Sequence, residues 1–288
     1  METPIEGTAD IQGVSIHYVC SGSGEPVLLI SGLGANAEMW VRQTPAFEQH
    51  HTVIRFDNRG AGRSDTPEGP YTIQTMASEA VQLLDALDIP AAHVVGASMG
   101  GMIAQEIAIQ YPDKALTLTL ISTQCGGSHA FGAAPESAST LEDLATLDMT
   151  PQERARGWVP YTLSQAFRES APDLVEEYVR VSSVFPSSTE GLRAQWAALM
   201  GYDSWERLGF VTAPTLILQG SADLVVPVEN ADVLGVRIPE SQVVLVPDAG
   251  HSIAFEAADR VNPLMLEFFA QHRYELEEPE DQDTRSGL

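Results

Sequence analysis

Hydrophobic residues in this chain gather in short uninterrupted runs that are separated by longer amphipathic stretches. Uninterrupted runs are typical of parallel strands that are buried on both faces. We therefore predict strands at Val27–Ile30, Val53–Phe56, His93–Ala97, Leu116–Ile121, Thr215–Gln219 and Val243–Val246. Near the start, Val14, Ile16 and Tyr18 alternate with polar residues. With the run Thr8–Ile11 and the turn at Gln12-Gly13, they predict an opening hairpin.

Helical periodicity fills the spaces between several of these runs. One apolar face ends before Pro90 and is marked by Met76, Val81, Leu84 and Leu87. A second helix is predicted over Met102–Tyr111, before Pro112, and a third is predicted to begin with Asn262 as N-cap and Pro263 as its first residue. Strands that alternate with helices predict an α/β fold, with a mostly parallel sheet covered by helices on both faces.

The alternation stops between about Cys125 and Phe210, where helix-compatible segments rich in aromatic residues replace strands. This division predicts an α/β core formed by residues 1–124 and 211–274, with residues 125–210 as a helical cap. The aromatic residues of the cap indicate an apolar pocket, although most of them also fit a cap interior. Residues 275–288 contain six acidic residues and one arginine, and we expect this tail to be disordered.

The net charge of the chain disfavours some classes of binding partner. Its 288 residues carry a formal net charge of −25, which argues against binding to nucleic acid or to an anionic membrane. Cys20 and Cys125 are expected to be reduced, and no Cys/His spacing indicates a metal site. Met1-Glu2-Thr3-Pro4-Ile5-Glu6 has neither a basic region nor an apolar run, so no signal peptide is expected here, and no apolar stretch reaches membrane-spanning length. A cytoplasmic location is therefore expected.

The sequence Gly96-Ala97-Ser98-Met99-Gly100-Gly101 follows one predicted strand and precedes a predicted helix. A serine in a Gly-x-Ser-x-Gly turn of this kind is exposed above the sheet edge, and the glycines allow the tight bend. Ser98 is therefore the candidate nucleophile.

A serine nucleophile needs a base and an acid that orients the base. Asp223 follows the strand Thr215–Gln219, and His251 follows the strand Val243–Val246, in the chain order expected for this architecture. Asp248 is the main alternative acid, but its place three residues before His251 favours a turn. The other histidines fit less well: His50 and His51 are expected to end an early helix, and His93 to open a strand.

The oxyanion of an acyl-transfer intermediate needs two backbone N–H donors. The residue after the nucleophile, Met99, is the first candidate, and Leu33 in the glycine-rich turn Ser31-Gly32-Leu33-Gly34 is the second. The sequence Asp57-Asn58-Arg59-Gly60-Ala61-Gly62-Arg63-Ser64 lacks the Lys-Ser/Thr of a phosphate loop. It is interpreted as a hydrogen-bonded turn that lines the floor of the pocket.

Together the elbow, the turn at Asp57–Ser64 and the loops of Asp223 and His251 resemble the α/β-hydrolase family from about Ile11 to Ala270. The resemblance implies an eight-stranded sheet with a cap inserted after the sixth strand. Within the family, the motifs look most like 3-oxoadipate enol-lactonases and related small esterases. Many members have His-Gly where this chain has Ser31-Gly32, so different hydrogen bonding is expected in that loop. Members with dehalogenase or epoxide hydrolase activity use an aspartate in place of Ser98.

The sequence thus predicts a serine hydrolase, monomeric or homodimeric, that cleaves small carboxylic esters or lactones with no cofactor and no metal. Cofactor-free haloperoxidase or perhydrolase chemistry and C–C bond hydrolysis use the same residues and are the alternatives. Ser252 directly after His251 disfavours C–C hydrolysis, since those relatives often have an aromatic residue there. A non-catalytic binding protein of the same fold is a further alternative, which the complete set of Ser98, Asp223 and His251 disfavours.

Overall fold

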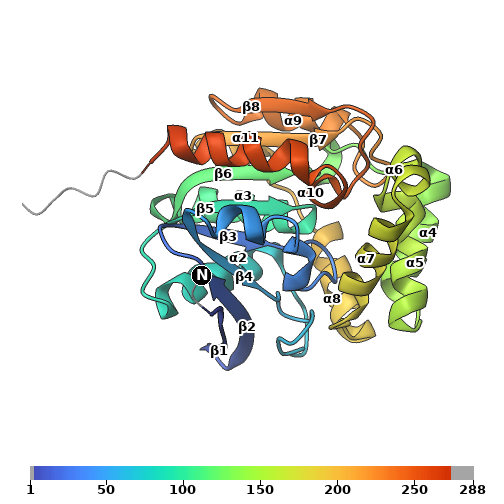
Figure 1. The fold of residues 1–288 in the computed structure, drawn as a ribbon, viewed down its shortest axis with the longest axis horizontal. Coiled ribbons are helices and arrows are strands. Elements are labelled where there is room, and N and C mark those ends of the chain that lie inside the picture. The colour runs from blue at the N-terminus through green and yellow to red at the C-terminus, as the bar shows by residue number, and fades with distance from the viewer. Residues whose placement is uncertain (1–2, 274–288) are drawn as a thin grey trace, which may run out of the picture.

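The structure is a computed structural model that describes residues 3–273. Within them, one eight-stranded sheet has the order β1-β2-β4-β3-β5-β6-β7-β8 (Figure 1). The strands are β1 (Ile5–Ile11), β2 (Val14–Ser21), β3 (Glu25–Ile30), β4 (His51–Phe56), β5 (Ala92–Ala97), β6 (Ala115–Ile121), β7 (Thr215–Gly220) and β8 (Gln242–Val246). The predicted strands are all present.

The direction of the strands follows the hydrophobic pattern. The alternating strands β1 and β2 form an antiparallel hairpin, and β2 pairs antiparallel with β4. From β4 through β8 every neighbouring pair is parallel. The predicted α/β class with a mostly parallel sheet is confirmed.

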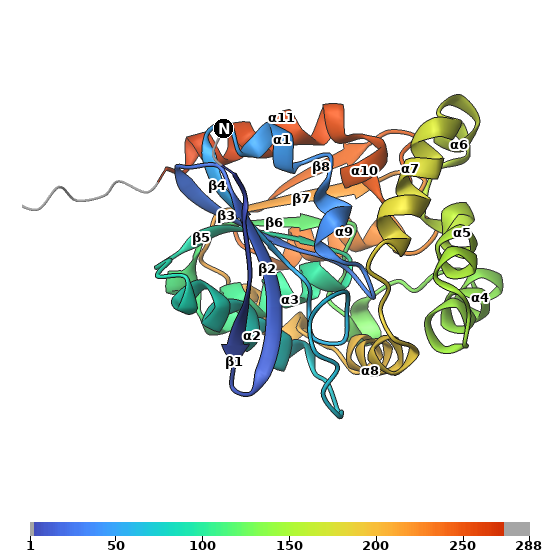
Figure 2. The ribbon, with the colours of Figure 1, turned by 60° about the horizontal axis from the view of Figure 1, so that its bottom comes forward.

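Helices cover both faces of the sheet (Figure 2). One face packs against α2 (Ile73–Ala86), α3 (Met99–Gln110) and α9 (Glu229–Arg237). The other packs against α1 (Thr44–Phe47) and α11 (Ala258–Gln271). The sheet is therefore the middle of three layers, and parallel strands buried on both sides leave only the strand ends for a site.

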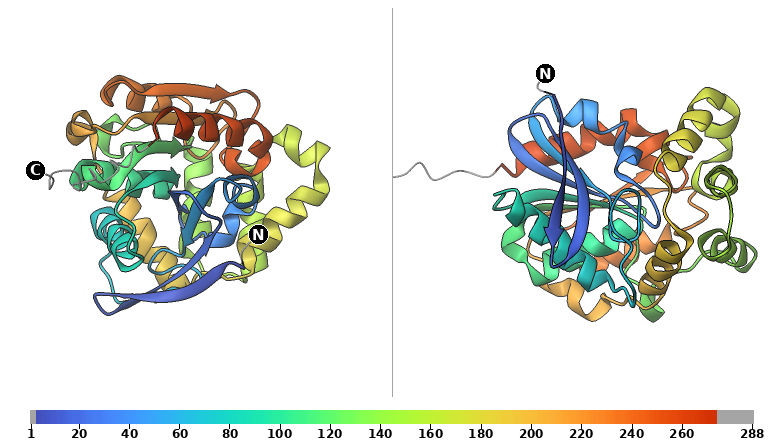
Figure 3. Two further views of the ribbon diagram at one scale, coloured as in Figure 1. Left: turned by 60° about the vertical axis from the view of Figure 1, so that its left-hand side comes forward. Right: turned by 90° about the horizontal axis from the view of Figure 1, so that it is seen from below.

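Five α-helices come between β6 and β7 in the sequence. They lie together at one end of the molecule (Figures 1 and 3). They are α4 (Pro135–Thr146), α5 (Pro151–Thr162), α6 (Gln165–Ser170), α7 (Pro172–Ser183) and α8 (Thr189–Met200). All five fall within the predicted cap, residues 125–210, and Cys125 and Leu208 near its two ends are fully buried in the cluster beside the sheet. We call α4–α8 the cap helices.

The predicted start of the last helix is wrong. The helix α11 begins at Ala258, and Pro263 lies inside it. The side chain of Asn262 does not cap the helix. It donates a hydrogen bond to the carbonyl of Arg42 and accepts one from Gln43 Nε2. Burial of apolar residues such as Met265 and Phe269 stabilises the helix despite the missing N–H of the proline.

Two smaller expectations also differ from the structure. The helix α1 ends at Phe47, so His51 does not end a helix but is the first residue of β4. The strand β8 is not buried on both faces: Val243 is 38% exposed and Leu245 is 48% exposed, because β8 forms an edge of the sheet. The tail 275–288, for which disorder was expected, lies outside the described residues.

Candidate active site

Ser98 occupies the sharp turn between β5 and α3. Its backbone has φ +54° and ψ −121°, a conformation that non-glycine residues seldom adopt. A Cβ atom on Gly96 would overlap the carbonyl oxygen of Gly100, and one on Gly100 would overlap the carbonyl oxygen of Ile30. Only glycine fits at these two positions, so the strained turn at Ser98 requires the glycines on both sides of it.

His251 and Asp223 form the acid–base pair that the sequence predicts. The residues follow β8 and β7, and His251 Nδ1 lies 2.9 Å from Asp223 Oδ2. Asp223 is only 8% exposed. Because an ionised carboxylate accepts hydrogen bonds only, this contact places the proton on Nδ1 and leaves Nε2 free to act as a base.

The carboxylate of Asp223 is itself held by several donors. Oδ1 accepts from the backbone N–H groups of Val225 (2.8 Å) and Val226 (2.9 Å), while Oδ2 also accepts from Gln219 Nε2 (2.9 Å). These bonds fix the direction in which the carboxylate faces His251. Asp248, the alternative acid, is exposed in a turn with φ +60°.

Ser98 and His251 line the same cavity at the carboxyl ends of the parallel strands. Among the hydrogen bonds of residues 3–273 there is none between the Ser98 hydroxyl and the His251 imidazole. Such catalytic bonds are often long without substrate and shorten in the complex. The structure thus brings the three predicted residues to one place and forms the Asp223–His251 bond.

The two predicted oxyanion donors belong to segments next to Ser98. Met99 is the first residue of α3, so its N–H has no partner within the helix. Leu33 lines the cavity, and Gly32 beside it is so close that a Cβ would lie 3.2 Å from the Ser98 Cβ. Within the described chain neither amide donates to a backbone or side-chain acceptor, so both remain available for an oxyanion.

Ser31 stabilises the loop that carries Leu33. Its hydroxyl accepts a hydrogen bond from Trp40 Nε1 (2.9 Å) and donates to the carbonyl of Asn36 (3.3 Å). The carbonyl of Ser31 accepts from Asn58 Nδ2 at 3.0 Å. In this loop, where relatives with His-Gly were expected to have different hydrogen bonds, the hydrogen bonds are therefore formed by Ser31 and Trp40.

The turn at Asp57–Ser64 supports this loop from outside the cavity. Asp57 Oδ1 accepts from the N–H of Ala37, and Oδ2 accepts from the N–H of Arg63 at 2.8 Å. The hydrogen-bonded turn is present as predicted. None of its residues is among those that line the described cavity, so its predicted place at the floor of the pocket is wrong.

The cavity has a volume of about 880 Å³, within the range of small-molecule sites. The cap helices contribute large apolar side chains to it, including Leu141, Trp158, Tyr178, Leu192 and Trp196. Arg154 also lines it, but its guanidinium donates to the carbonyls of Leu144 and Leu147. The wall of the cavity above Ser98 is thus mostly apolar.

The loop of His251 is bound to the cap helices through Glu256, in α10 (Ile253–Glu256). One carboxylate oxygen accepts from the N–H of Gly250, and the other accepts from the N–H of Ser164 at 2.8 Å. The N–H of Ser252 donates to the carbonyl of Thr162 at 2.8 Å. Burial is the main cause that raises the pKa of Glu256 above its usual value of 4.5. The residues on both sides of His251 are therefore held by the cap.

Three polar residues that support the site were not predicted from the sequence. Gln219 holds Asp223, Glu256 holds the loop of His251, and Gln195 in α8 accepts from the N–H of Gly34 at 2.7 Å. Gln219 and Gln195 are at most 1% exposed. Their signal in the sequence is weak, since a polar residue within an apolar run or a helix is consistent with many structures.

Comparisons with known proteins agree with this geometry. The sequence matches the family described as the alpha/beta hydrolase fold over residues 25–258. The chain belongs to the α/β-hydrolase family. The "Putative non-heme bromoperoxidase BpoC" from Mycobacterium tuberculosis is 32% identical to this hydrolase over 263 residues, which cover 89% of this chain and 98% of the relative.

Two enol-lactonases are also similar to this hydrolase. The 3-oxoadipate enol-lactonase 2 from Acinetobacter baylyi is 30% identical over 248 residues, 85% of this chain and 89% of the relative. The crystal structure of an enol-lactonase from Burkholderia xenovorans has a TM-score of 0.81 at 25% identity, covering 92% of this chain and all of that one (100%). The predicted fold and family are confirmed, while the relatives differ in the reactions for which they are named.

No helix in the described part of this hydrolase is long and apolar enough to cross a membrane.

Proposed function

We propose that this hydrolase cleaves carboxylic esters or lactones through an acyl-enzyme formed on Ser98. The observation that carries the proposal is the 2.9 Å contact between His251 and Asp223 in a cavity that Ser98 also lines. A non-catalytic binding protein would need neither the strained turn at Ser98 nor a carboxylate that orients an imidazole.

Acylation begins with attack of Ser98 Oγ on the acyl carbon. His251 Nε2 takes the proton of the hydroxyl, and Asp223 stabilises the imidazolium that results. The carbonyl oxygen of the substrate becomes negatively charged, and the N–H groups of Leu33 and Met99 donate hydrogen bonds to it. When the C–O bond breaks, His251 returns the proton to the alkoxide, which leaves as an alcohol or, for a lactone, stays attached to the acyl group.

Deacylation repeats these steps with water. His251 Nε2 takes a proton from water, whose oxygen attacks the ester carbon of the acyl-enzyme. The same two amides stabilise the second oxyanion. The proton then returns to Ser98 Oγ, and the carboxylic acid is released.

The cavity favours uncharged acyl groups of medium size. Its cap wall is formed mostly by apolar side chains, and the guanidinium of Arg154 donates to two backbone carbonyls rather than standing free. We therefore expect butyrate to octanoate esters to be hydrolysed faster than acetate esters, because more apolar surface is buried in the transition state.

The test is a panel of p-nitrophenyl esters and aliphatic lactones with the parent protein and S98A. We expect turnover in the parent and a loss of about 10³-fold or more in S98A. S170A, which removes an exposed hydroxyl on α6, is the matched control and should keep parent activity. Equal rates in the parent and S98A would contradict the proposal.

The name of the Mycobacterium tuberculosis relative makes perhydrolysis the second candidate. Here peroxide replaces water in deacylation and forms a peracid, which oxidises bromide. Peroxide-dependent bromination that exceeds ester hydrolysis in the same buffer would favour this second function.

A further inference from the structure

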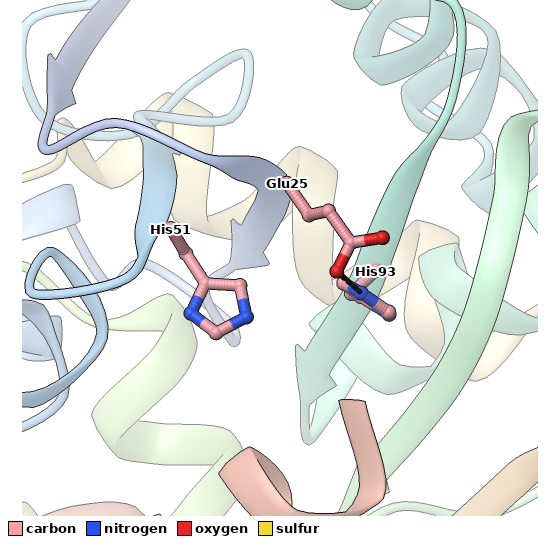
Figure 4. Close-up of side chains that lie close together, drawn as sticks. All are labelled: Glu25, His51 and His93. Carbon is pink, nitrogen blue, oxygen red and sulfur yellow. Dashed lines mark ion pairs between the residues drawn. The ribbon is translucent and has the colours of Figure 1, made fainter. Parts of the chain in front are cut away.

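The amino ends of three neighbouring parallel strands bring together Glu25, His51 and His93 (Figure 4). Glu25 opens β3, His51 opens β4, and His93 is the second residue of β5. Within the described residues, one possible ligand atom of each lies within 4.8 Å of those of the other two.

The register of the strands explains why the three side chains meet. Glu25 is paired with His51 in β3–β4, and Val27 is paired with His93 in β3–β5. Side chains two residues apart in a strand point to the same face. All three therefore lie on the face that α11 covers, with the ring of Phe269 stacked on His93 at 4.6 Å between centroids.

The two imidazoles are buried and incompletely hydrogen-bonded. His51 is 7% exposed and His93 is 0% exposed. His93 Nδ1 is 2.9 Å from Thr117 Oγ1, but His93 Nε2 and His51 Nδ1 have no hydrogen-bond partner among residues 3–273. His93 Nε2 is 4.0 Å from Glu25 Oε2, which is too far for a hydrogen bond.

A divalent cation would satisfy this arrangement. Within the described residues, each of the two buried rings has a nitrogen without a hydrogen-bond partner, and an imidazole nitrogen is a common metal ligand. Metal–nitrogen and metal–oxygen bonds of about 2.0–2.2 Å place the ligand atoms of a tetrahedral ion about 3.4 Å apart, so atoms that lie within 4.8 Å of one another reach a common ion after small side-chain rotations. A bond from the other ring nitrogen, such as that of His93 to Thr117, is usual for a metal-binding histidine.

We propose that Glu25, His51 and His93 form a second site, which binds a divalent transition-metal ion of the Zn²⁺ or Co²⁺ class. The site is remote from the chemistry, since His93 and Ser98 lie at opposite ends of β5, about 16 Å apart along the strand. The ion connects three adjacent strands of the sheet, so its effect is on stability rather than on hydrolysis. Sequence spacing gave no sign of it because each ligand comes from a different strand.

The test is titration of the full chain with Co²⁺ and Zn²⁺ after removal of metal by a chelator. We expect one Co²⁺ per chain, with a visible absorption band, and a higher melting temperature with Zn²⁺. H51N and E25Q should each weaken binding at least tenfold, whereas H50N, which changes the exposed neighbouring histidine, should not. The rate of ester hydrolysis should be the same with and without the ion.

The outcomes distinguish binding at this site from binding at the surface. They also distinguish failure of the metal site from failure of the proposed function. Absence of stoichiometric binding in the parent, or equal weakening by H50N and H51N, would overturn the site. Circular dichroism identifies a variant that fails to fold, and because Glu25 is half-buried, E25Q provides a test that does not disturb the two buried rings. Metal binding does not depend on Ser98, so S98A should bind Co²⁺ as the parent does.

Discussion

At the scale of single residues, the site depends on side chains that their hydrogen bonds and backbone turns hold in a single orientation. Asp223 has donors on both carboxylate oxygens, and only one of these donors is the imidazole of His251. Ser98 is held by a turn that needs glycine at positions 96 and 100. Neighbouring groups that take no part in the reaction therefore position the residues for the proposed chemistry.

D223N tests the orientation of the imidazole. The amide oxygen should stay with the N–H groups of Val225 and Val226, which turns the NH₂ group toward His251 Nδ1. Nδ1 must then accept a hydrogen bond, Nε2 carries the proton, and the base is lost. We expect kcat for a p-nitrophenyl ester to fall about 10³–10⁴-fold with little change in KM.

D248N is the matched control for this change. Asp248 is exposed and lies three residues before His251, so the same substitution there should leave kcat unchanged. A greater loss in D248N than in D223N would mean that Asp223 is not the orienting acid.

The identities of Ser98, Asp223 and His251 could be predicted because each follows an uninterrupted apolar run, and parallel strands place such positions at one edge. Gln195, Gln219 and Glu256 could not be predicted. Their roles depend on which backbone groups approach them from distant parts of the chain, and local sequence does not contain that information.

At the scale of elements, the cap helices and the loop of His251 are joined by the carboxylate of Glu256. Its two oxygens accept from Gly250 on the loop and from Ser164 at the start of α6 (Gln165–Ser170). Burial in this position favours the neutral carboxyl, while the two N–H donors favour the ionised form; burial is the larger effect, and the pKa is raised.

E256Q tests the pH dependence that results. The folded state holds the Glu256 proton to a higher pH than the unfolded state does, whose carboxyl has a pKa near 4.5. The stability contributed by this proton is fully present below pH 4.5. It is lost as the pH rises through the raised pKa of Glu256 in the folded state. We therefore expect the free energy of unfolding of the parent, relative to E256Q, to decrease over that window in urea titrations.

E267Q, which alters an exposed carboxylate on α11, should follow the parent at every pH. If the parent instead gains stability relative to E256Q as the pH rises, the two N–H donors outweigh burial and the stated cause of the shift is wrong.

Hydrophobic runs predicted the strands well and the helix ends less well. The Asn262-Pro263 pair has the local pattern of a helix start, but Asn262 bonds to Arg42 and Gln43, and the helix begins at Ala258. Tertiary contacts here outweigh local preference, which is why the position of the pair could not be judged from its neighbours in sequence.

At the scale of the whole molecule, the order of the strands determines what meets at each edge of the sheet. The carboxyl edge brings together Ser98, Asp223 and His251, and the amino edge brings together Glu25, His51 and His93. The alternation of strands and helices predicted a parallel sheet, but it does not fix the order β2-β4-β3-β5. The proximity of Glu25, His51 and His93 depends on that order and could not be read from the sequence.

The proposed chemistry of the whole molecule requires that Ser98 is the nucleophile of an acyl-transfer site. The most direct test is reaction of the folded parent with a fluorophosphonate, followed by digestion and mass spectrometry of the labelled peptide. We expect one label per chain on the peptide that contains Ser98, and no label on S98A. A label on another residue, or equal labelling of S98A, would contradict it.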